Sequence, residues 1–392
     1  MSTNEKLKNF LLSTALVVDD EIINCESTIS KIVATLEDKG TLFIKLRDLP
    51  GSVDGISDLG FIILDWDLRK EEDVSDIPQE VLLGSTLLEV QKNDVKEFIK
   101  DIITRYFVPI FIFTRENIEA IKTNLESDDV IKVAIEKRRI FLCNKSDLAG
   151  EQIIAKLNDW LNESIAVYTF KIMEEAIERA KHRFFNELDL CDPKWPCHVY
   201  QTLKKDSPAD INSDFQEFLM SSYTSAIEPI RFNHDGFDQD VTLSDEEILK
   251  IYSKIKFFAY QDDWCIGPHP GDLYEIDDGV GGEYYINVSA ACDMRNGEYY
   301  FIRGKAVAET QEKICLYNIY KIKDKEIVMF DFRCVKIAKP QSNYNLLKFG
   351  DKNNTKIYRR VGRLLNPYIR AMQEKFSHYI IRTGTMRDPN MC

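Results

Sequence analysis

Apolar runs alternate with amphipathic segments over the first 150 residues of the chain. Five short runs are rich in β-branched and aromatic residues, as is typical of strands buried on both faces: ALVV (15–18), TLFIKL (41–46), FIIL (61–64), PIFIF (109–113) and IFLC (140–143). Helical spacing of the intervening apolar residues predicts helices over about 22–36, 86–106 and 116–125, and another from Asp147 onward. The alternation predicts an α/β fold with a doubly wound, five-stranded parallel sheet.

Helical periodicity continues beyond the fifth predicted strand. Apolar residues between Asp147 and Leu188 predict one long helix, or two helices with a break near AVYTF (166–170). We interpret 147–190 as a long helical linker. A helix packed on its neighbours is favoured over a signalling stalk or dimer surface, because the apolar pattern is too broad for a heptad seam. Residues 191–262 predict a further helical segment with polar, acidic loops.

Residues 263–392 are rich in Gly, Tyr and β-forming residues. Five segments there predict short antiparallel strands: DLYEI (272–276), EYYINVSA (283–290), EYYFIRGKAVAE (298–309), ICLYNIYKI (314–322) and IVMFDFRCVKIA (327–338). We expect a small antiparallel β-barrel-like domain. An apolar stripe at helical spacing from Ile357 to Tyr379, within a basic segment, predicts a terminal basic amphipathic helix.

Composition narrows the class of protein. The 392-residue chain has a net charge of −14, so most of its surface would repel polyphosphate and a general nucleic-acid binder is not expected. Nine scattered cysteines without a CxxC pair fit reduced thiols better than a disulfide framework. Because no segment resembles a signal peptide or a membrane span, we expect a cytoplasmic protein without a membrane partner.

Acidic and polar residues end four of the predicted strands. Asp19 and Asp20 follow the first strand, Asp65 ends the third, Thr114 ends the fourth, and Lys145 follows the fifth. The carboxyl ends of parallel strands meet at one edge of the sheet, where α/β proteins hold their ligands, so all five residues should face one crevice. Clustered carboxylates repel one another, and Mg²⁺ bound through oxygen ligands is the natural explanation.

With these residues at these strand ends, the segment from Ser13 to Leu148 resembles the receiver domains of two-component response regulators. The resemblance implies a flavodoxin-like receiver domain over 1–146. It also implies that Asp65 is the phosphoryl acceptor and a metal ligand. The other metal ligands implied are Asp19, Asp20 and the backbone carbonyl of Asp67.

The same resemblance implies roles for two further residues. Thr114 would hydrogen-bond the bound phosphoryl group, and Lys145 would pair with Asp65 or its phosphate. A carboxylate that attacks a phosphorylated donor needs charge neutralisation more than covalent help, which fits these residue types and Mg²⁺.

The segment also departs from the usual receiver pattern. Ser146 replaces the proline that usually follows the lysine, and Leu142 stands where an aromatic switch residue is expected, with Phe141 displaced by one position. The loop RKEEDVSDIPQEVLLG (69–84) is longer and more acidic than usual. Arg115 follows Thr114 in place of a small residue. It either pairs with the phosphate or is a surface residue that pairs with Glu116 or Glu119.

Two weaker patterns lie in the C-terminal region. GPHPGDLYEI and SAACDM are similar to parts of SH3-like barrels of the toxin-endoribonuclease type, and Arg295 or Arg303 would be the basic residue that such catalysis needs. That likeness bears on fold rather than on catalysis. A candidate zinc set lacks the paired short spacings of structural sites, so buried cysteines and a turn histidine are favoured instead: Cys265, His269, Asp272 and Cys292.

The sequence favours a phosphorylation-controlled signalling protein that regulates binding of a downstream partner protein. The alternative is a receiver-gated effector enzyme with an RNA-cleaving C-terminal barrel, but no acid, base and electrophile set can be assembled there. We therefore expect no enzymatic activity beyond receiver phosphorylation and dephosphorylation. The architecture also resembles receiver proteins of bacterial conflict systems, which implies antiphage defence and a histidine-kinase-like ATPase or another phosphodonor. A second copy of the chain is a further candidate partner, and RNA at the basic C-terminal region a less favoured one.

Overall fold

The computed structural model divides the chain into two compact units. The first unit comprises Met1–Leu188 and Tyr223–Asp240, and the second comprises Asp189–Ser222 and Val241–Cys392. The residues that the structure describes are 3–54, 56, 58–68, 85–148, 150–206, 211–232, 235–259, 269–277, 282–290, 299–307, 319–322, 326–338, 345–349 and 355–381.

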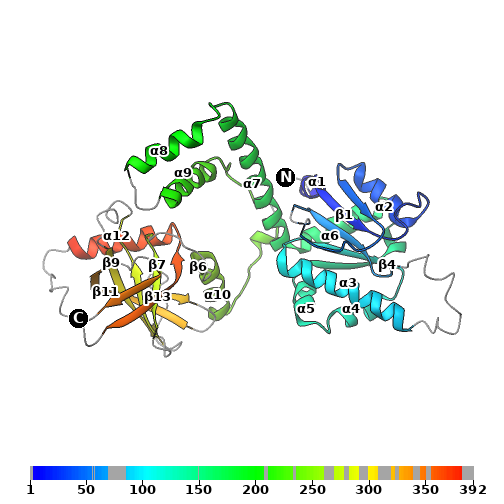
Figure 1. Ribbon diagram of the computed structural model, residues 1–392. Coiled ribbons are helices and arrows are strands. Elements are labelled where there is room, and N and C mark those ends of the chain that lie inside the picture. The colour runs from blue at the N-terminus through cyan, green and yellow to red at the C-terminus, as the bar shows by residue number, and fades with distance from the viewer. Residues whose placement is uncertain are drawn as a thin grey trace. The chain divides into compact units, whose positions relative to one another are not determined.

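A five-stranded parallel sheet forms the centre of the first unit (Figure 1). Its strands are β1 (Thr14–Val18), β2 (Leu42–Leu46), β3 (Phe61–Asp65), β4 (Ile110–Thr114) and β5 (Ile140–Asn144), in the order β2-β1-β3-β4-β5. The predicted α/β sheet of five parallel strands is confirmed. Every residue of β3 and β4 is buried, which is why these strands read as continuous apolar runs.

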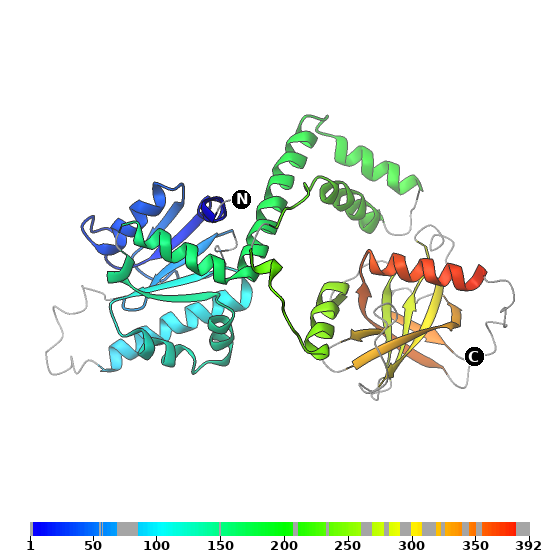
Figure 2. The same ribbon diagram turned by 180° about the vertical axis from the view of Figure 1, so that it is seen from behind.

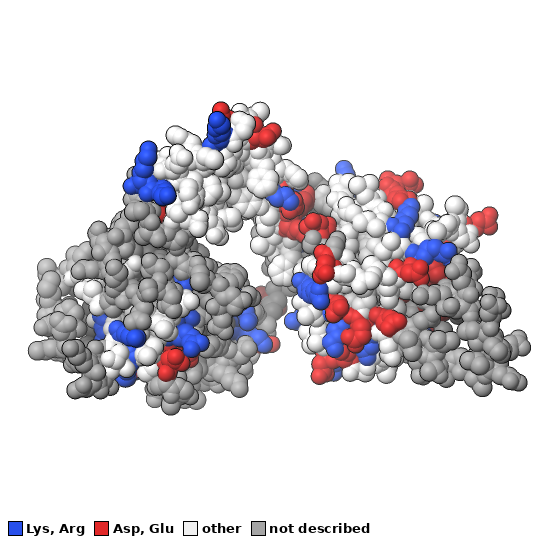
Figure 3. Space-filling view, in the orientation of Figure 1, with Lys and Arg blue, Asp and Glu red and all other residues white. Residues whose placement is uncertain are grey.

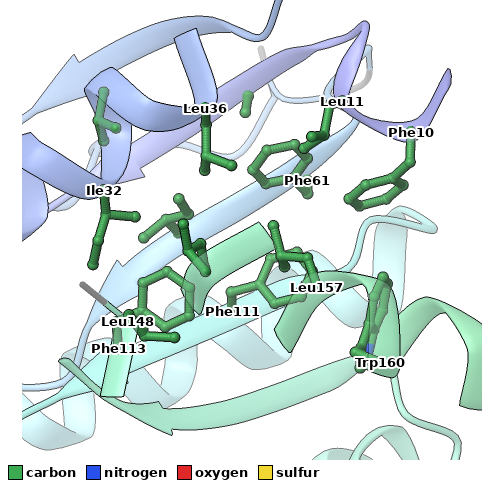
Figure 4. Packing of buried hydrophobic residues seen from close by; sticks show 14 of the residues in the cluster. Phe10, Leu11, Ile32, Leu36, Phe61, Phe111, Phe113, Leu148, Leu157 and Trp160 are labelled. Carbon is green, nitrogen blue, oxygen red and sulfur yellow. The ribbon is translucent and has the colours of Figure 1, made fainter. Parts of the chain in front are cut away.

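One face of this sheet is covered by helices α1 (Thr3–Leu11), α2 (Thr28–Glu37) and α6 (Gln152–Glu163). Figure 4 shows their side chains meeting those of β3 and β4 in one apolar core. Phe10 of α1 stacks on Phe61 with ring centroids 5.2 Å apart and lies 5.5 Å from Trp160 of α6. Helix α1 was not predicted from the sequence.

The other face is covered by α3 (Ser85–Arg105), α4 (Ile118–Leu125) and α5 (Asp129–Glu136), as the two opposite views in Figures 1 and 2 show. The sequence predicted one helix over 116–125, and α5 is an addition. Asp128 separates α5 from α4 because its carboxylate caps the amides of Val130 and Ile131. Between β2 and β3 the described residues form no helix, and apolar side chains such as Val53 and Ile56 are buried there.

The structure places two helix boundaries that the sequence located only approximately. The helix expected to begin near residue 22 begins at Thr28, because the Ser27 hydroxyl caps the amide of Ser30. Of the two alternatives for 147–188, one long helix or two with a break near AVYTF, the chain forms two helices; the break lies at Ser164, and α7 (Ile165–Asp189) runs through AVYTF. Val167 and Tyr168 are buried in the core of the first unit, and this packing outweighs their weak helix propensity.

Helices α8 (Trp195–Asp206), α9 (Ile211–Ser225) and α10 (Asp245–Lys256) follow, as the amphipathic pattern predicted. The second unit then forms a curled antiparallel sheet. Its strands are β6 (Phe257–Ala259), β7 (Asp272–Ile276), β8 (Glu283–Asn287), β9 (Tyr299–Val307), β10 (Ile319–Ile322), β11 (Glu326–Ala338), β12 (Leu346–Phe349) and β13 (Lys356–Leu364). Each of the five segments predicted to be strands overlaps one of β7 to β11.

The prediction of a terminal helix from Ile357 to Tyr379 is wrong for 357–364. Residues 356–364 form β13, which pairs with β7 on one side and β12 on the other. Tyr358, Arg360 and Leu364 are buried at alternating positions, a strand period that the apolar residues alone concealed. Only α12 (Tyr368–Ile381) is helical, and it buries Ile369, Met372 and Phe376 against the sheet.

Candidate functional site

The carboxyl ends of the parallel strands gather three acids. Asp19 and Asp20 follow β1, and Asp65 is the last residue of β3. One carboxylate oxygen from each lies within 4.8 Å of the others. Asp19 and Asp65 are buried because the strands that carry them lie inside the sheet. The sequence brought these residues to one edge, and the structure places their oxygens close enough to share one cation.

Lys145 joins two of these carboxylates. It follows β5 in a short 3₁₀ helix, Lys145–Leu148, and only 3% of it is exposed. Its Nζ donates to Asp19 Oδ2 and to Asp65 Oδ2, each at 2.7 Å. Buried charges are tolerated when they are paired in this way, so the four residues form one electrostatic unit, which we call the acidic site: Asp19, Asp20, Asp65 and Lys145.

Burial sets the protonation of the acidic site. Desolvation, aided by the neighbouring Asp19, raises the pKa of Asp65 to about 7 even though Lys145 opposes the shift. Burial and Asp19 also raise the pKa of Asp20. Burial lowers the pKa of Lys145, but Asp65 and Asp19 together reverse this and hold it above its usual value. The metal-free site therefore binds protons readily, and a divalent cation would compete with them.

Backbone amides complete the polar contacts. The amide of Glu21 donates to Asp19 Oδ1 at 2.9 Å, and the amide of Asp67 donates to Asp65 Oδ1 at 3.3 Å. Asp67 thus contacts Asp65 through its backbone amide. These bonds fix the rotamers of Asp19 and Asp65 and orient their remaining lone pairs.

Thr114 lies at the end of β4, beside the strand that carries Asp65. It is fully buried, and its Oγ1 accepts from the amide of Glu116 at 3.0 Å. The hydroxyl proton is left to donate elsewhere, as a group that binds an oxyanion must. The carboxylate of Glu116 in turn pairs with Lys92 of α3 at 2.8 Å.

Arg115 contacts neither of the acids that the sequence suggested. Its partner is Glu21, which accepts a bidentate pair of hydrogen bonds at 2.9 and 2.7 Å. The predicted pairing with Glu116 or Glu119 is wrong. Glu21 lies 94 positions away in the chain, so only tertiary structure reveals this contact.

The departures at β5 have a simple geometry. Leu142 and Phe141 point to opposite faces of the sheet, into the two separate cores that cover it. Phe141 packs near Phe111, with ring centroids 6.0 Å apart. Ser146, in place of proline, donates its hydroxyl to Asn144 Oδ1 at 2.8 Å. The acidic loop 69–84 lies outside the described residues.

The weaker C-terminal candidates that the structure describes form no cluster of metal-binding groups. Cys265, Cys292 and Arg295 lie outside the described residues, and Arg303 lies on β9 opposite Tyr285. His269 donates its backbone amide to Asp272, whose fully buried carboxylate also binds two guanidinium groups, those of Arg360 at 3.1 Å and Arg363 at 2.9 Å. Asp272 therefore has a structural role in the described chain.

Comparison with known proteins gave no match among protein-family models, curated proteins or solved structures. Among the helices that the structure describes, none combines the length and the apolar character that crossing a membrane requires.

Proposed function

We propose that the first unit is a Mg²⁺-dependent phosphoryl acceptor of the receiver type, and that phosphate on Asp65 controls binding of a partner protein. The observation that carries this proposal is the acidic site, in which three clustered carboxylates and a buried lysine meet at the carboxyl edge of a parallel sheet. Ligand sites of such sheets lie at this edge.

The residues present fit a hard divalent cation. Asp19, Asp20 and Asp65 offer oxygen ligands, and because burial raises the pKa of Asp65, a cation beside it would favour its charged form. Lys145 neutralises part of this charge and leaves each carboxylate with free lone pairs. Bound Mg²⁺ would supply the remaining charge neutralisation for an incoming phosphate.

The chain's own residues then account for phosphoryl transfer. A carboxylate oxygen of Asp65 attacks the phosphorus of the donor, and the bond between phosphorus and the donor's leaving group breaks. The product is an acyl phosphate on Asp65. Lys145, already 2.7 Å from Asp65, stabilises the charge on the transferred group, and the Thr114 hydroxyl donates to one of its oxygens.

Phosphorylation of Asp65 would alter contacts that extend from the site to the surface. Moving the Thr114 hydroxyl toward a phosphoryl group would disturb its bond with the Glu116 amide and hence the Glu116–Lys92 ion pair between the β4–α4 loop and α3. A partner that distinguishes the two arrangements would bind in one state only. We propose a histidine-kinase-like ATPase or a small acyl phosphate as donor and a role in bacterial defence, on the receiver resemblance alone.

The test is phosphorylation of the full chain with acetyl phosphate and Mg²⁺, followed by intact-mass measurement. Wild type should gain one phosphoryl group, and Asp65→Ala and a Mg²⁺-free sample should gain none. Trp66, buried next to the acceptor, reports binding of the phosphoryl mimic beryllofluoride by fluorescence. Wild type that behaves like Asp65→Ala would refute the proposal.

The output needs a separate measurement. Oligomeric state and partner binding should change when beryllofluoride and Mg²⁺ are added to wild type and should not change for Asp65→Ala. An RNA-cleavage assay runs in parallel. Unchanged assembly together with cleavage that depends on beryllofluoride would replace regulated partner binding with the effector-enzyme alternative.

A further inference from the structure

Arg115 and Glu21 form an ion pair between two loops that adjoin the acidic site. Both nitrogens of the Arg115 fork donate to the Glu21 carboxylate, Nη1 to Oε1 at 2.9 Å and Nη2 to Oε2 at 2.7 Å. The pair connects the β4–α4 loop with the segment after β1. We call it the latch pair.

Each end of the latch pair is attached to a residue of the site. The amide of Glu21 donates to Asp19 Oδ1 at 2.9 Å. Arg115 directly follows Thr114, whose hydroxyl oxygen holds the next amide at 3.0 Å. A rearrangement of either loop would therefore displace a residue that is bonded to, or adjacent to, Asp19 or Thr114.

The charge balance makes Arg115 a natural ligand for a phosphoryl group. Phosphorylation replaces the single charge of the Asp65 carboxylate with a dianionic group, whereas Lys145 already serves Asp19 and Asp65. A guanidinium fork matches phosphate as well as it matches carboxylate. Glu21 and a phosphoryl group on Asp65 would thus compete for the same two donors.

The competition favours phosphate once it is present. Side chains of the latch pair are 61% and 34% exposed, and ion pairs at such positions contribute little because water screens them. A doubly charged phosphoryl group beside a buried site is screened less and accepts stronger charge-assisted hydrogen bonds.

We propose that Arg115 is a phosphoryl-binding residue that Glu21 holds back until Asp65 is phosphorylated. This inference rests on the proposed phosphoryl acceptance at Asp65 and adds a residue, Arg115, that binds the phosphoryl group. When Arg115 turns to the phosphate, Glu21 loses its partner and the loop after β1 is released. In this way the latch pair would take the role of the aromatic switch residue, whose position is occupied by Leu142 in this chain.

The experiment measures beryllofluoride affinity of the full chain at saturating Mg²⁺, by Trp66 fluorescence or calorimetry. Arg115→Ala should weaken binding about tenfold, equivalent to about 1.4 kcal/mol. Glu21→Gln should tighten binding about threefold, because the competitor for Arg115 is gone. The double variant should match Arg115→Ala. Arg105→Ala, which breaks an exposed ion pair with Asp54 at 3.0 Å, is the control and should match wild type.

The outcomes separate the two proposals. Absence of Mg²⁺-dependent beryllofluoride binding by wild type would refute both. Normal binding by wild type, with Arg115→Ala and Glu21→Gln unchanged, would overturn the latch and leave phosphoryl acceptance intact. Glu21→Gln that tightens binding equally in the Arg115→Ala background would also overturn it, because the effect would then be general electrostatics rather than release of Arg115.

Discussion

Lys145 lies between two buried carboxylates, so its removal tests whether they depend on a cation. Without Mg²⁺, Lys145→Met should lower the free energy of unfolding of the first unit by about 3 kcal/mol, because it leaves Asp19 and Asp65 without their charged partner. Mg²⁺ should restore most of this stability, since the three acids remain, but phosphoryl uptake should stay impaired.

Urea unfolding with and without Mg²⁺ measures the effect of this substitution. Lys92→Met is the matched control, because the Lys92–Glu116 pair is partly exposed and should contribute less than about 1 kcal/mol. Lys145→Met that is unstable in Mg²⁺ yet takes up phosphate normally in its folded fraction would show a purely structural lysine.

The raised pKa of Asp65 predicts how metal binding depends on pH. Because this pKa is about 7, protons compete with Mg²⁺ below neutrality, and affinity should fall by up to about tenfold per pH unit there. Calorimetric Mg²⁺ titrations between about pH 6 and about pH 8 measure this. Equal affinity across that range would contradict the prediction.

The same shift determines the sign of the stability change in the metal-free protein. Folding raises the pKa of Asp65 from about 4 to about 7, so the folded state binds this proton more tightly than the unfolded state does. The contribution of this proton to the free energy of unfolding is fully present below about pH 4 and is lost as pH rises through about 7. Asp65→Asn should abolish this slope.

At the scale of elements, α1 stabilises a core that the strands cannot complete alone. Phe10 contacts Phe61, Phe111 and Trp160. Phe10→Ala should therefore lower the free energy of unfolding by about 3–5 kcal/mol. Leu12→Ala, at a side chain that is 56% exposed, should cost within about 0.5 kcal/mol. Chemical unfolding of both variants measures these changes. If Phe10→Ala lowers the free energy of unfolding as little as Leu12→Ala is expected to, α1 is dispensable for packing.

At the scale of the whole molecule, the two units have separate apolar cores. Among the described residues, the buried clusters of the first unit end at Tyr168, whereas those of the second begin at Leu273. On the first-unit face visible in Figure 3, acidic and basic side chains are interspersed. We expect the two units to unfold as separate transitions, with Mg²⁺ raising only that of the first.

Gly271 allows this expectation to be tested. Its φ of +88° disfavours other residues, and an added Cβ would lie 2.3 Å from the carbonyl oxygen of Leu364. Gly271→Ala should lower the stability of the second unit by at least about 2 kcal/mol and leave Mg²⁺ binding unchanged. Gly51→Ala, which meets nothing within 4 Å, is the control. Calorimetry that shows both transitions shifting in Gly271→Ala would contradict separate unfolding.

Local sequence by itself determined the strands and the edge at which the chemistry gathers. Buried parallel strands must be apolar throughout, so β3 and β4 were visible as uninterrupted runs, and the polar residues that end them, Asp65 and Thr114, stood out. The shared edge then followed from the geometry of parallel sheets, which is why the sequence alone predicts that Asp19, Asp65 and Lys145 lie together.

Tertiary structure alone decided the contacts that cross the chain. The Arg115 partner could not be chosen among many surface acids, because an ion pair leaves no local pattern. Ile357 to Leu364 fits a helical stripe or a strand, and pairing with β7 and β12 decided for the strand. The sequence left one long helix or two open for 147–188; the break lies at Ser164, and 166–170 are helical because burial of Val167 and Tyr168 outweighs a propensity difference of less than about 1 kcal/mol per residue.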